Sequence, residues 1–265
     1  MTILDKIITQ KQIEVANAKE RTPIKILEQS EFFNRSTFSF KKHLSDKSKV
    51  GIIAEFKRKS PSKGIINADA DVQQTTAGYV NAGASALSIL TDFEFFGGKS
   101  EDITIARKFN NCPILRKEFI IDAYQIIEAK SIGADVILLL ANVLNASQIK
   151  QFAKFAKSFG LEILLEVRDK DELETMNEYI DAVGVNNRNL KDFNVNLSQS
   201  FDLVDLIPND FVKVSESGIG SAKTIHELKS AGFKGFLMGE TFMKQANPAL
   251  ACAEFIKEVE KKMNK

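Results

Sequence analysis

Short apolar runs alternate with amphipathic stretches along the chain from residue 50 onward. Several of these runs are apolar on both faces, which is typical of strands that are covered on both sides. The stretches between them, such as 123–132 and 146–156, place apolar residues at helical spacing. Eight strands are predicted, at Gly51–Lys57, Ala86–Thr91, Pro113–Lys117, Asp135–Leu140, Glu162–Val167, Ala182–Asn186, Phe211–Ser215 and Gly235–Met238.

The order of these elements predicts an α/β protein. Glycines stand before several strands, at positions 83, 133, 160 and 232, where the preceding helix would end. Eight strands that alternate with helices fit a closed (β/α)8 TIM barrel, a fold of about 250 residues. An open doubly wound sheet is the alternative, but the chain has neither G-x-G-x-x-G nor G-x-x-x-x-G-K-[ST].

Residues 1–49 precede the first predicted strand and form a segment of their own. Positions 3, 4, 7 and 8 form an apolar stripe at helical spacing. Four phenylalanines follow, and so many large apolar side chains are not expected to be exposed to solvent. We expect 1–49 to be a helical extension packed on the barrel near its mouth, and 50–265 to be the barrel. The aromatic anchors are Phe32, Phe33, Phe38 and Phe40.

The bulk composition narrows the class of protein. The 265 residues are 44% hydrophobic and 27% charged, with a formal net charge of +1. This charge gives no general reason to expect nucleic acid or membrane as a partner, although Lys57–Lys63 could form a basic patch for nucleic acid. No apolar run reaches the roughly 20 residues of a membrane span, and no secretory signal is evident. The isolated Cys112 and Cys252 favour a cytoplasmic protein with reduced thiols.

Charged and polar side chains interrupt the apolar runs where the predicted strands end. Side chains alternate between the faces of a strand, so Ile53, Glu55 and Lys57 are expected to share one face. In barrel enzymes the reacting groups lie at the C-terminal ends of the strands. Each charge alone could form a structural ion pair, but five strands with such ends predict a functional site. The candidates are Glu55, Lys57, Lys117, Glu166, Asn186, Asn187, Arg188, Glu216 and Ser217.

The remaining residue types narrow the chemistry. His43 lies in the N-terminal segment and His226 in a predicted helix, and no spacing typical of metal ligands occurs. Acid–base catalysis would therefore fall to Lys and Glu, with lysine pKa values lowered by burial or by a neighbouring ammonium. The loops after strands seven and eight contain Gly218 and Gly239, and such loops often bind phosphate in barrels. Ser60 in the first loop could add a hydroxyl donor.

Seven segments, in order, resemble the indole-3-glycerol phosphate synthase family. The similarity runs from about residue 2 to 245 and is specific as a set. It implies a carbon–carbon lyase (a carboxy-lyase) of tryptophan biosynthesis that acts on 1-(2-carboxyphenylamino)-1-deoxyribulose 5-phosphate. Ring closure, loss of CO₂ and loss of water would form indole-3-glycerol phosphate without a metal or organic cofactor. The segments are Ile53–Ser62, Leu90–Asp92 with Phe95–Gly98, Leu115–Ile120, Leu164–Val167, Val183–Leu190, Ser215–Ile219 and Phe236–Glu240, and Leu4–Ile7 also fits.

The resemblance also implies a role for each candidate residue. Lys117 looks like the general acid, Glu166 like the group that transfers protons in the dehydration, and Lys57 like the cation that holds the substrate carboxylate and shares the acid role. The other residues would orient these groups or bind the substrate. The orienting residues would be Glu55, Asn186, Glu216 and Ser217. The slot for the anthranilate ring would be lined by Phe96, Phe119, Leu138 and Leu140. The phosphate would be bound by Ser60, Gly218, Gly239 and the Glu240 N–H, and the substrate also by Arg188.

Two positions depart from the family pattern. Arg168 stands where many members have His, and Glu240 stands where some have Ser, so its carboxylate is expected to point away from the phosphate. The alternative enzyme is another phosphate-binding barrel such as phosphoribosylanthranilate isomerase, which would commonly use a Cys/Asp pair. Cys112 precedes a predicted strand and Cys252 lies in the last helix, so neither suits that pair. We expect a monomer that binds a small phosphorylated substrate and can associate with other tryptophan-pathway enzymes.

Overall fold

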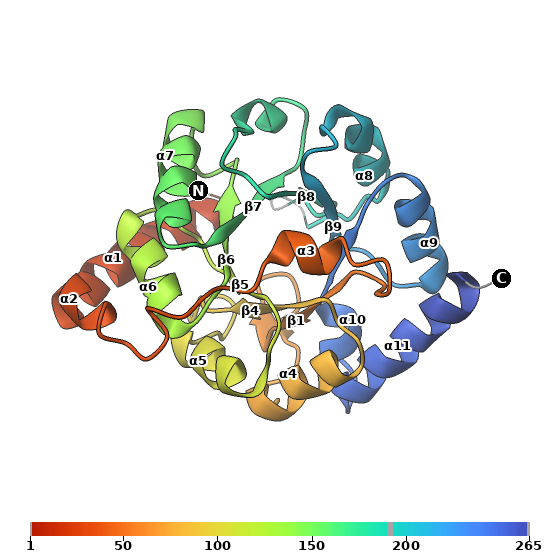
Figure 1. Cartoon of the computed structure of the whole chain (residues 1–265), viewed down its shortest axis with the longest axis horizontal. Helices are drawn as coiled ribbons and strands as arrows, with labels where there is room; N and C mark the ends of the chain where they lie inside the picture. The colour runs from red at the N-terminus through yellow and green to blue at the C-terminus, as the bar shows by residue number, and fades with distance from the viewer. Residues whose placement is uncertain (1, 190–192, 264–265) are drawn as a thin grey trace.

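Eight parallel strands close into a barrel in the computed structural model, which describes residues 2–189 and 193–263 (Figure 1). The barrel order is β1-β10-β9-β8-β7-β6-β5-β4, and each neighbouring pair is parallel. The (β/α)8 prediction is confirmed. Leu190, the last residue of the fifth family segment, lies outside the described residues. The barrel strands are β1 (Ile52–Phe56), β4 (Ala86–Leu90), β5 (Ile114–Lys117), β6 (Val136–Leu140), β7 (Glu162–Val167), β8 (Ala182–Asn186), β9 (Val212–Glu216) and β10 (Gly235–Met238).

The two faces of β1 differ as the sequence predicts. Ile52, Ala54 and Phe56 belong to the apolar cluster between the strands and the outer helices, whereas Ile53 belongs to the cluster inside the barrel. Glu55 follows Ile53 on the inner face. The period-two alternation of a strand therefore directs a carboxylate into the barrel.

Helices cover the outside of the barrel. Several begin at a side chain that accepts a backbone N–H of the first turn, including Asp71, Asp122, Asn145 and Ser221, which fixes where each helix starts. The connection after β7 has only the short 3₁₀ helix η1 (Glu172–Thr175). The other helices are α4 (Val72–Asn81), α5 (Ser100–Phe109), α6 (Ala123–Ile132), α7 (Ala146–Ser158), α8 (Ser198–Leu203) with η2 (Val204–Leu206), α9 (Ala222–Ser230), α10 (Glu240–Met243) and α11 (Pro248–Met263).

The N-terminal segment covers both ends of the barrel. It contains α1 (Ile3–Arg21), α2 (Ile24–Leu27) and α3 (Phe40–Leu44), and α3 crosses the barrel in Figure 1. Phe40 is fully buried in the inner cluster, and Ser39 Oγ donates to Glu162 Oε1 at 2.6 Å, where β7 begins. The segment was expected near the mouth, and α1 does lie there. Phe40 of α3 closes the opposite end, because α3 hydrogen-bonds to Glu162 at the start of β7. The division of the chain at residue 49 stays a prediction.

The first connection of the barrel carries a small ladder of its own. β2 (Lys59–Ser60) pairs with β3 (Gly64–Ile65) in antiparallel fashion, so the loop after β1 is a short hairpin. Arg58 anchors its base, because its guanidinium donates to both carboxylate oxygens of Asp102 on α5, at 2.5 and 3.0 Å. The hairpin is therefore held over the C-terminal ends of the strands. Within the described ranges, no helix has the length and apolar character needed to cross a membrane.

Candidate active site

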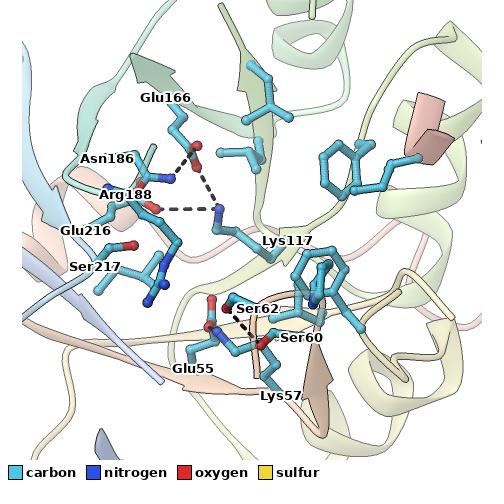
Figure 2. A pocket seen from close by; sticks show the side chains of 18 of the residues that line it. Glu55, Lys57, Ser60, Ser62, Lys117, Glu166, Asn186, Arg188, Glu216 and Ser217 are labelled. Atoms are coloured by element: carbon cyan, nitrogen blue, oxygen red, sulfur yellow. Dashed lines mark hydrogen bonds and ion pairs between the residues drawn. The ribbon is translucent and has the colours of Figure 1, made fainter. Parts of the chain in front are cut away.

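A cavity of about 950 Å³, which includes space open to solvent, lies at the C-terminal ends of the barrel strands (Figure 2). Its lining combines apolar side chains with a few converging polar groups, as is typical of small-molecule sites. The structure brings most of the predicted site residues together there, whereas Asn187, Gly218 and Gly239 do not line the cavity. The predicted residues that line it are Glu55, Lys57, Ser60, Phe96, Lys117, Phe119, Leu138, Leu140, Glu166, Asn186, Arg188, Glu216, Ser217 and Glu240.

Lys117 stands at the centre of the polar half of the cavity. It ends β5, and its Nζ lies 2.7 Å from Glu166 Oε2 on β7 and 3.5 Å from Glu216 Oε2 on β9. Asn186 at the end of β8 donates from Nδ2 to Glu166 Oε1 at 2.8 Å. Figure 2 shows these side chains pointing toward one another from different strands of the barrel. Because closure of the barrel brings these strand ends together, residues far apart in sequence form one hydrogen-bonded cluster.

The carboxylates around Lys117 set its protonation state. Burial opposes its charged form, but the carboxylates of Glu166, Glu216 and Glu55 outweigh burial and raise the pKa of Lys117 above its ordinary value. The sequence-based expectation of a lowered lysine pKa is therefore wrong for Lys117, since its nearest neighbours are anions and not another ammonium. Lys117 thus enters any reaction as a protonated acid.

The two glutamates beside Lys117 differ in charge. Burial would raise the pKa of Glu166, but the Lys117 ammonium and the Asn186 hydrogen bond hold that pKa below its ordinary value. Burial, together with the carboxylates of Glu166 and Glu55, raises the pKa of Glu216 to about 8 against the effect of Lys117. Near neutral pH, Glu166 is therefore ionised and Glu216 holds a proton. Environments that separate the pKa values of neighbouring acids in this way are typical of acid–base sites.

A glycine makes room for Glu216. A Cβ built on Gly184, in the neighbouring strand β8, would lie 2.3 Å from Glu216 Oε1. Gly239, after β10, has the same relation to Glu55, whose Oε1 would lie 2.5 Å from an added Cβ. Any larger residue at either position would therefore displace the carboxylate from the place where it now lies.

Glu55 and Lys57 form a second ion pair at the mouth. Lys57 Nζ lies 2.6 Å from Glu55 Oε1, and the Ser88 hydroxyl on β4 donates to Glu55 Oε2 at 3.4 Å. The Glu55 side chain is 4% exposed and that of Lys57 is 18% exposed. The Lys57 ammonium therefore faces the cavity, whereas the Glu55 carboxylate with which it pairs is buried behind it.

The opposite wall of the cavity is apolar. The rings of Phe96, in the loop after β4, and Phe119, in the loop after β5, lie 6.0 Å apart with their planes at 37°. Leu138 and Leu140 project from β6 into the same inner cluster, and Ile7 of α1 belongs to it as well. This wall can hold a planar aromatic ring beside the Lys117 ammonium.

The third part of the cavity is lined by the hairpin and the loops after β9 and β10. Ser60 Oγ lies 3.4 Å from Ser62 Oγ in the hairpin. Ser217 and Gly218 follow β9 with positive φ angles of 68° and 76°. Left-handed backbone is unusual for serine, and such residues concentrate at functional sites. Thr241 Oγ1 donates to the Ile219 carbonyl at 3.2 Å and ties the two loops together.

Glu240 does not turn away from this region, in contrast to the expectation from the sequence. Its two carboxylate oxygens lie 3.7 Å from Lys63 Nζ and 3.7 Å from Arg188 Nη2, and it lines the cavity. The two cations neutralise the carboxylate, which explains why it is tolerated at the rim. Arg168, the other departure, pairs with Glu172 at 3.0 Å and does not line the cavity.

Sequence reasoning did not assign a role to Asn187, which organises one side of the site. The buried Nδ2 of Asn187 donates to Ser215 Oγ at 3.1 Å and to the carbonyls of Glu216 at 2.9 Å and Ser217 at 3.1 Å. It follows Asn186 directly, so the strand alternation that turns Asn186 inward turns Asn187 toward the backbone of β9. Pro61, Ser62 and Phe193 also line the cavity and were not predicted.

Residue types typical of other chemistries lie elsewhere. His43 lies on α3 at the closed end of the barrel, and His226 lies on the outer helix α9. Cys112 and Cys252 are buried before β5 and in α11. Over residues 2–189 and 193–263, no group of three His, Cys, Asp or Glu residues is placed to hold a metal ion. Neither cysteine lines the cavity, so the described cysteines do not place a Cys/Asp pair there.

Solved structures with a similar fold come from several enzymes. The chain matches a chain of the tryptophan synthase complex from Pyrococcus furiosus with a TM-score of 0.59 and 14% identity, over 80% of this chain and 98% of that chain. It matches 3-hexulose-6-phosphate synthase from Salmonella typhimurium with a TM-score of 0.59 and 14% identity, over 80% and 99%. At such identity the likeness concerns the fold alone.

Two curated relatives are much more similar in sequence, and both are named indole-3-glycerol phosphate synthase. The protein from Bacteroides thetaiotaomicron is 45% identical over 258 residues, which cover 97% of this chain and 99% of that protein. The protein from Campylobacter fetus subsp. fetus is 41% identical over 245 residues, which cover 92% and 95%. A model of the family described as indole-3-glycerol phosphate synthase matches residues 4–255. The chain therefore belongs to the indole-3-glycerol phosphate synthase family.

Proposed function

We propose that this chain is an indole-3-glycerol phosphate synthase whose cavity closes the ring of 1-(2-carboxyphenylamino)-1-deoxyribulose 5-phosphate. The observation that carries the proposal is a protonated Lys117 held 2.7 Å from Glu166, next to an aromatic slot. An acid beside a site for a flat ring is what attack by an aromatic carbon on a carbonyl requires. Family membership supports the same reaction.

Lys117 acts as the general acid in ring closure. The substrate carbonyl takes a proton from Lys117 Nζ as the aromatic carbon attacks, so no free alkoxide forms. The raised pKa of Lys117 in the free protein ensures that the proton is present, and Glu166 and Glu216 hold the ammonium in place. After this step the C–C bond is formed, and departure of CO₂ returns the electron pair to the ring.

Glu166 serves the dehydration. Its lowered pKa keeps it ionised and ready to accept a proton, while Asn186 fixes its second oxygen. Loss of the hydroxyl as water needs a proton donor, which Lys117 provides after it regains a proton. The protonated Glu216 lies 3.5 Å from Lys117 Nζ and orients the ammonium without adding a further buried negative charge.

The rest of the cavity binds the substrate. Lys57 holds the carboxylate, which is lost as CO₂, and Phe96 and Phe119 hold the ring. Ser60 and the backbone N–H groups of the loops after β9 and β10 take the phosphate. Glu55, Asn186 and Ser217 orient the reacting groups, and Gly218, Gly239 and Arg188 complete the phosphate end.

The biological setting follows from the proposed function. The enzyme acts as a monomer in the cytoplasm and can associate with other enzymes of tryptophan biosynthesis. Sedimentation equilibrium of the purified chain tests this assignment, since a dimer at micromolar concentration would contradict it. Residues 1–49 form part of the catalytic unit, because Ile3, Leu4 and Ile7 line the cavity.

Indole fluorescence tests the reaction directly, because the chain has no Trp and only three Tyr. Purified protein is mixed with the carboxyphenylamino-deoxyribulose phosphate, and emission is followed over time. We expect a rise with the wild type and a loss of roughly 10²- to 10⁴-fold in kcat for Lys117→Met, since a general acid contributes that much. Lys150→Met, an exposed lysine on α7, is the matched control. No rise from folded wild type would reject the reaction, and near-normal kcat for Lys117→Met would reject the acid.

A further inference from the structure

Lys11 is the most deeply enclosed cation of the N-terminal helix α1, and it does not line the cavity. Its side chain is 4% exposed, and its Nζ lies 2.6 Å from Glu14 Oε2, 3.0 Å from Asp92 Oδ2 and 3.0 Å from Glu118 Oε1. The side chains of Asp92 and Glu118 are 0% and 3% exposed. Removal of one partner from such a buried group leaves an uncompensated charge, which is costly, so Lys11 and its carboxylates depend on one another. These partners come from two different loops of the barrel.

Each of the two buried carboxylates also holds a segment that carries a ring of the aromatic slot. Asp92, in the loop after β4, accepts the Phe95 N–H on Oδ1 at 2.8 Å, and Phe96 follows. Glu118 accepts the Phe119 N–H on Oε1 at 2.7 Å. The ammonium of Lys11 therefore joins the two loops through the carboxylates that hold the backbone just before Phe96 and at Phe119.

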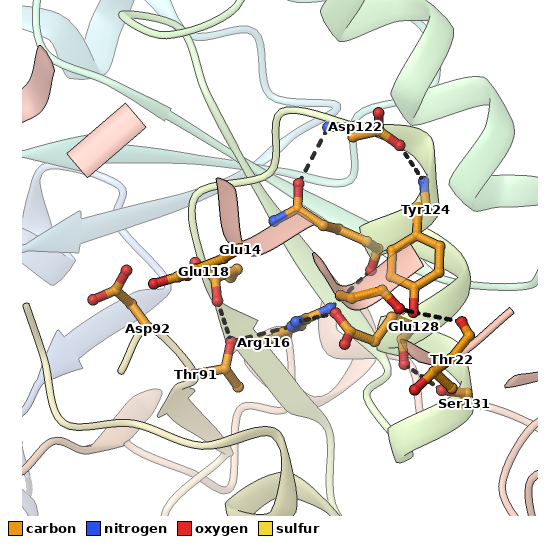
Figure 3. Close-up of polar contacts among 12 residues, drawn as sticks. Glu14, Thr22, Thr91, Asp92, Arg116, Glu118, Asp122, Tyr124, Glu128 and Ser131 are labelled. Atoms are coloured by element: carbon orange, nitrogen blue, oxygen red, sulfur yellow. Dashed lines mark hydrogen bonds and ion pairs between the residues drawn. The ribbon is translucent and has the colours of Figure 1, made fainter. Parts of the chain in front are cut away.

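The same network reaches the proposed acid. Glu118 directly follows Lys117, and its Oε2 accepts the Thr91 hydroxyl at 2.7 Å. Thr91 donates its backbone N–H to the Lys117 carbonyl at 3.3 Å and accepts from Arg116 Nε at 3.2 Å. Figure 3 shows Thr91, Glu118 and Arg116 linked in this way, with Asp92 and Glu14 nearby. The Lys11 partners are thus continuous with the backbone of β5 at its catalytic end.

From this geometry we propose that Lys11 is a positioning residue for the reaction: it fixes the loops after β4 and β5 so that the Phe96–Phe119 slot presents the substrate ring to Lys117. The inference rests on the proposed function and adds to it a residue outside the barrel. Lys11 touches neither the substrate nor the reacting atoms, so its effect passes through Asp92 and Glu118. The N-terminal helix thereby controls the anthranilate end of the cavity and not the phosphate end.

Lys19 provides an internal contrast on the same helix. It also pairs with the barrel, 2.7 Å from Asp122 Oδ2, but its side chain is 47% exposed and Asp122 caps the outer helix α6. Removing Lys19 loosens α1 without touching the two slot loops. Val15, buried on α1, offers a second contrast, because Val15→Ala weakens the packing of the helix without changing any charge.

The test compares Lys11→Met with Lys19→Met and Val15→Ala, well below the melting temperature of each variant. We expect kcat/KM of Lys11→Met to fall about 10- to 100-fold, since misplacement of a reacting group by about 1 Å can reduce rate by 10². Anthranilate, used as a competitive inhibitor, should bind several-fold more weakly, whereas inhibition by inorganic phosphate should stay unchanged. Both control variants should keep wild-type values in all three measurements.

Glu118→Gln is the second variant, for the case that Lys11→Met fails to fold. Its amide oxygen can still accept the Phe119 N–H, whereas its attraction for the Lys11 ammonium is weaker because the carboxylate charge is gone. Glu118→Gln should lower kcat/KM and anthranilate binding by a smaller factor than Lys11→Met does. The double variant should lose no more kcat/KM than Lys11→Met alone, because both changes break the same contact. Equal losses of anthranilate and phosphate binding, or equal effects of Val15→Ala, would overturn the proposal. Turnover by wild type establishes the proposed function separately, whatever these variants do.

Discussion

Glu216 should make the stability of this protein depend on pH in an unusual direction. Its pKa is raised from 4.5 to about 8 by burial and by neighbouring carboxylates. Between these values the folded protein keeps a proton that the unfolded chain releases. Stability contributed by this proton is fully present below pH 4.5 and is lost as pH rises through 8. Most acidic groups act in the opposite sense, and Glu166, with its lowered pKa, loses its contribution only as pH falls below its ordinary range.

The size of this pH effect on the free energy of unfolding follows from the interval between the unfolded and folded pKa values of Glu216. One pKa unit corresponds to about 1.4 kcal/mol, so the interval from pH 5 to pH 8 corresponds to on the order of 4 kcal/mol. Glu216→Gln keeps the shape of the protonated acid but has no proton to lose. The free energy of unfolding of wild type should therefore fall relative to this variant by roughly that amount over the interval, although many other groups titrate in both proteins.

Urea denaturation at a series of pH values measures this difference. Far-UV circular dichroism is a suitable probe, because the chain has no Trp but many helices. Glu254→Gln, an exposed position on α11, is the control and should run parallel to wild type. If Glu216→Gln also runs parallel to wild type from pH 5 to 8, then Glu216 is ionised in the folded protein and the charge assignment around Lys117 is wrong.

Two further predictions concern the phosphate end of the cavity. Ser60→Ala should raise KM about tenfold with kcat within about twofold, because it removes one hydrogen bond to a charged group; steady-state kinetics check this, and a loss confined to kcat would contradict the phosphate role. Glu240→Gln should strengthen competitive inhibition by inorganic phosphate up to about fivefold, because it frees Lys63 and Arg188 from a partly exposed carboxylate. Weaker inhibition in that variant would show that Glu240 helps to organise the two cations.

The strands and their inward faces were accessible from the sequence, because both depend on local patterns. No predicted boundary of a barrel strand differs from the observed one by more than one residue. Alternation within β1 sufficed to place Glu55 inside the barrel, and polar residues at five strand ends sufficed to place the site. The sequence segments of the family identified the same residues independently.

Other features depend on groups that meet only after the barrel closes. The raised pKa of Lys117 requires carboxylates from β1, β7 and β9, and no local pattern reports their distance. The space that Gly184 leaves for Glu216 likewise depends on the register of two strands. In the sequence, Lys11 is an ordinary polar position of an amphipathic helix, and only the fold brings Asp92 and Glu118 to it. Phe40 reads as an aromatic anchor, but its place at the closed end depends on α3 binding the starts of the strands.

The path of the N-terminal segment has a consequence for biosynthesis. Its anchoring bonds join residues far apart in sequence: 97 positions separate Phe38 from Asp135, and 123 separate Ser39 from Glu162. On a ribosome that adds roughly 5 to 20 residues per second, the first helices wait about 6 to 25 seconds for these partners. During that time Ile7 of α1 and Phe40 of α3 lack the barrel contacts that bury them in the folded protein. The part of the chain that is made first therefore docks only after the strands up to β7 have been made, and before β10 is available to close the barrel on β1.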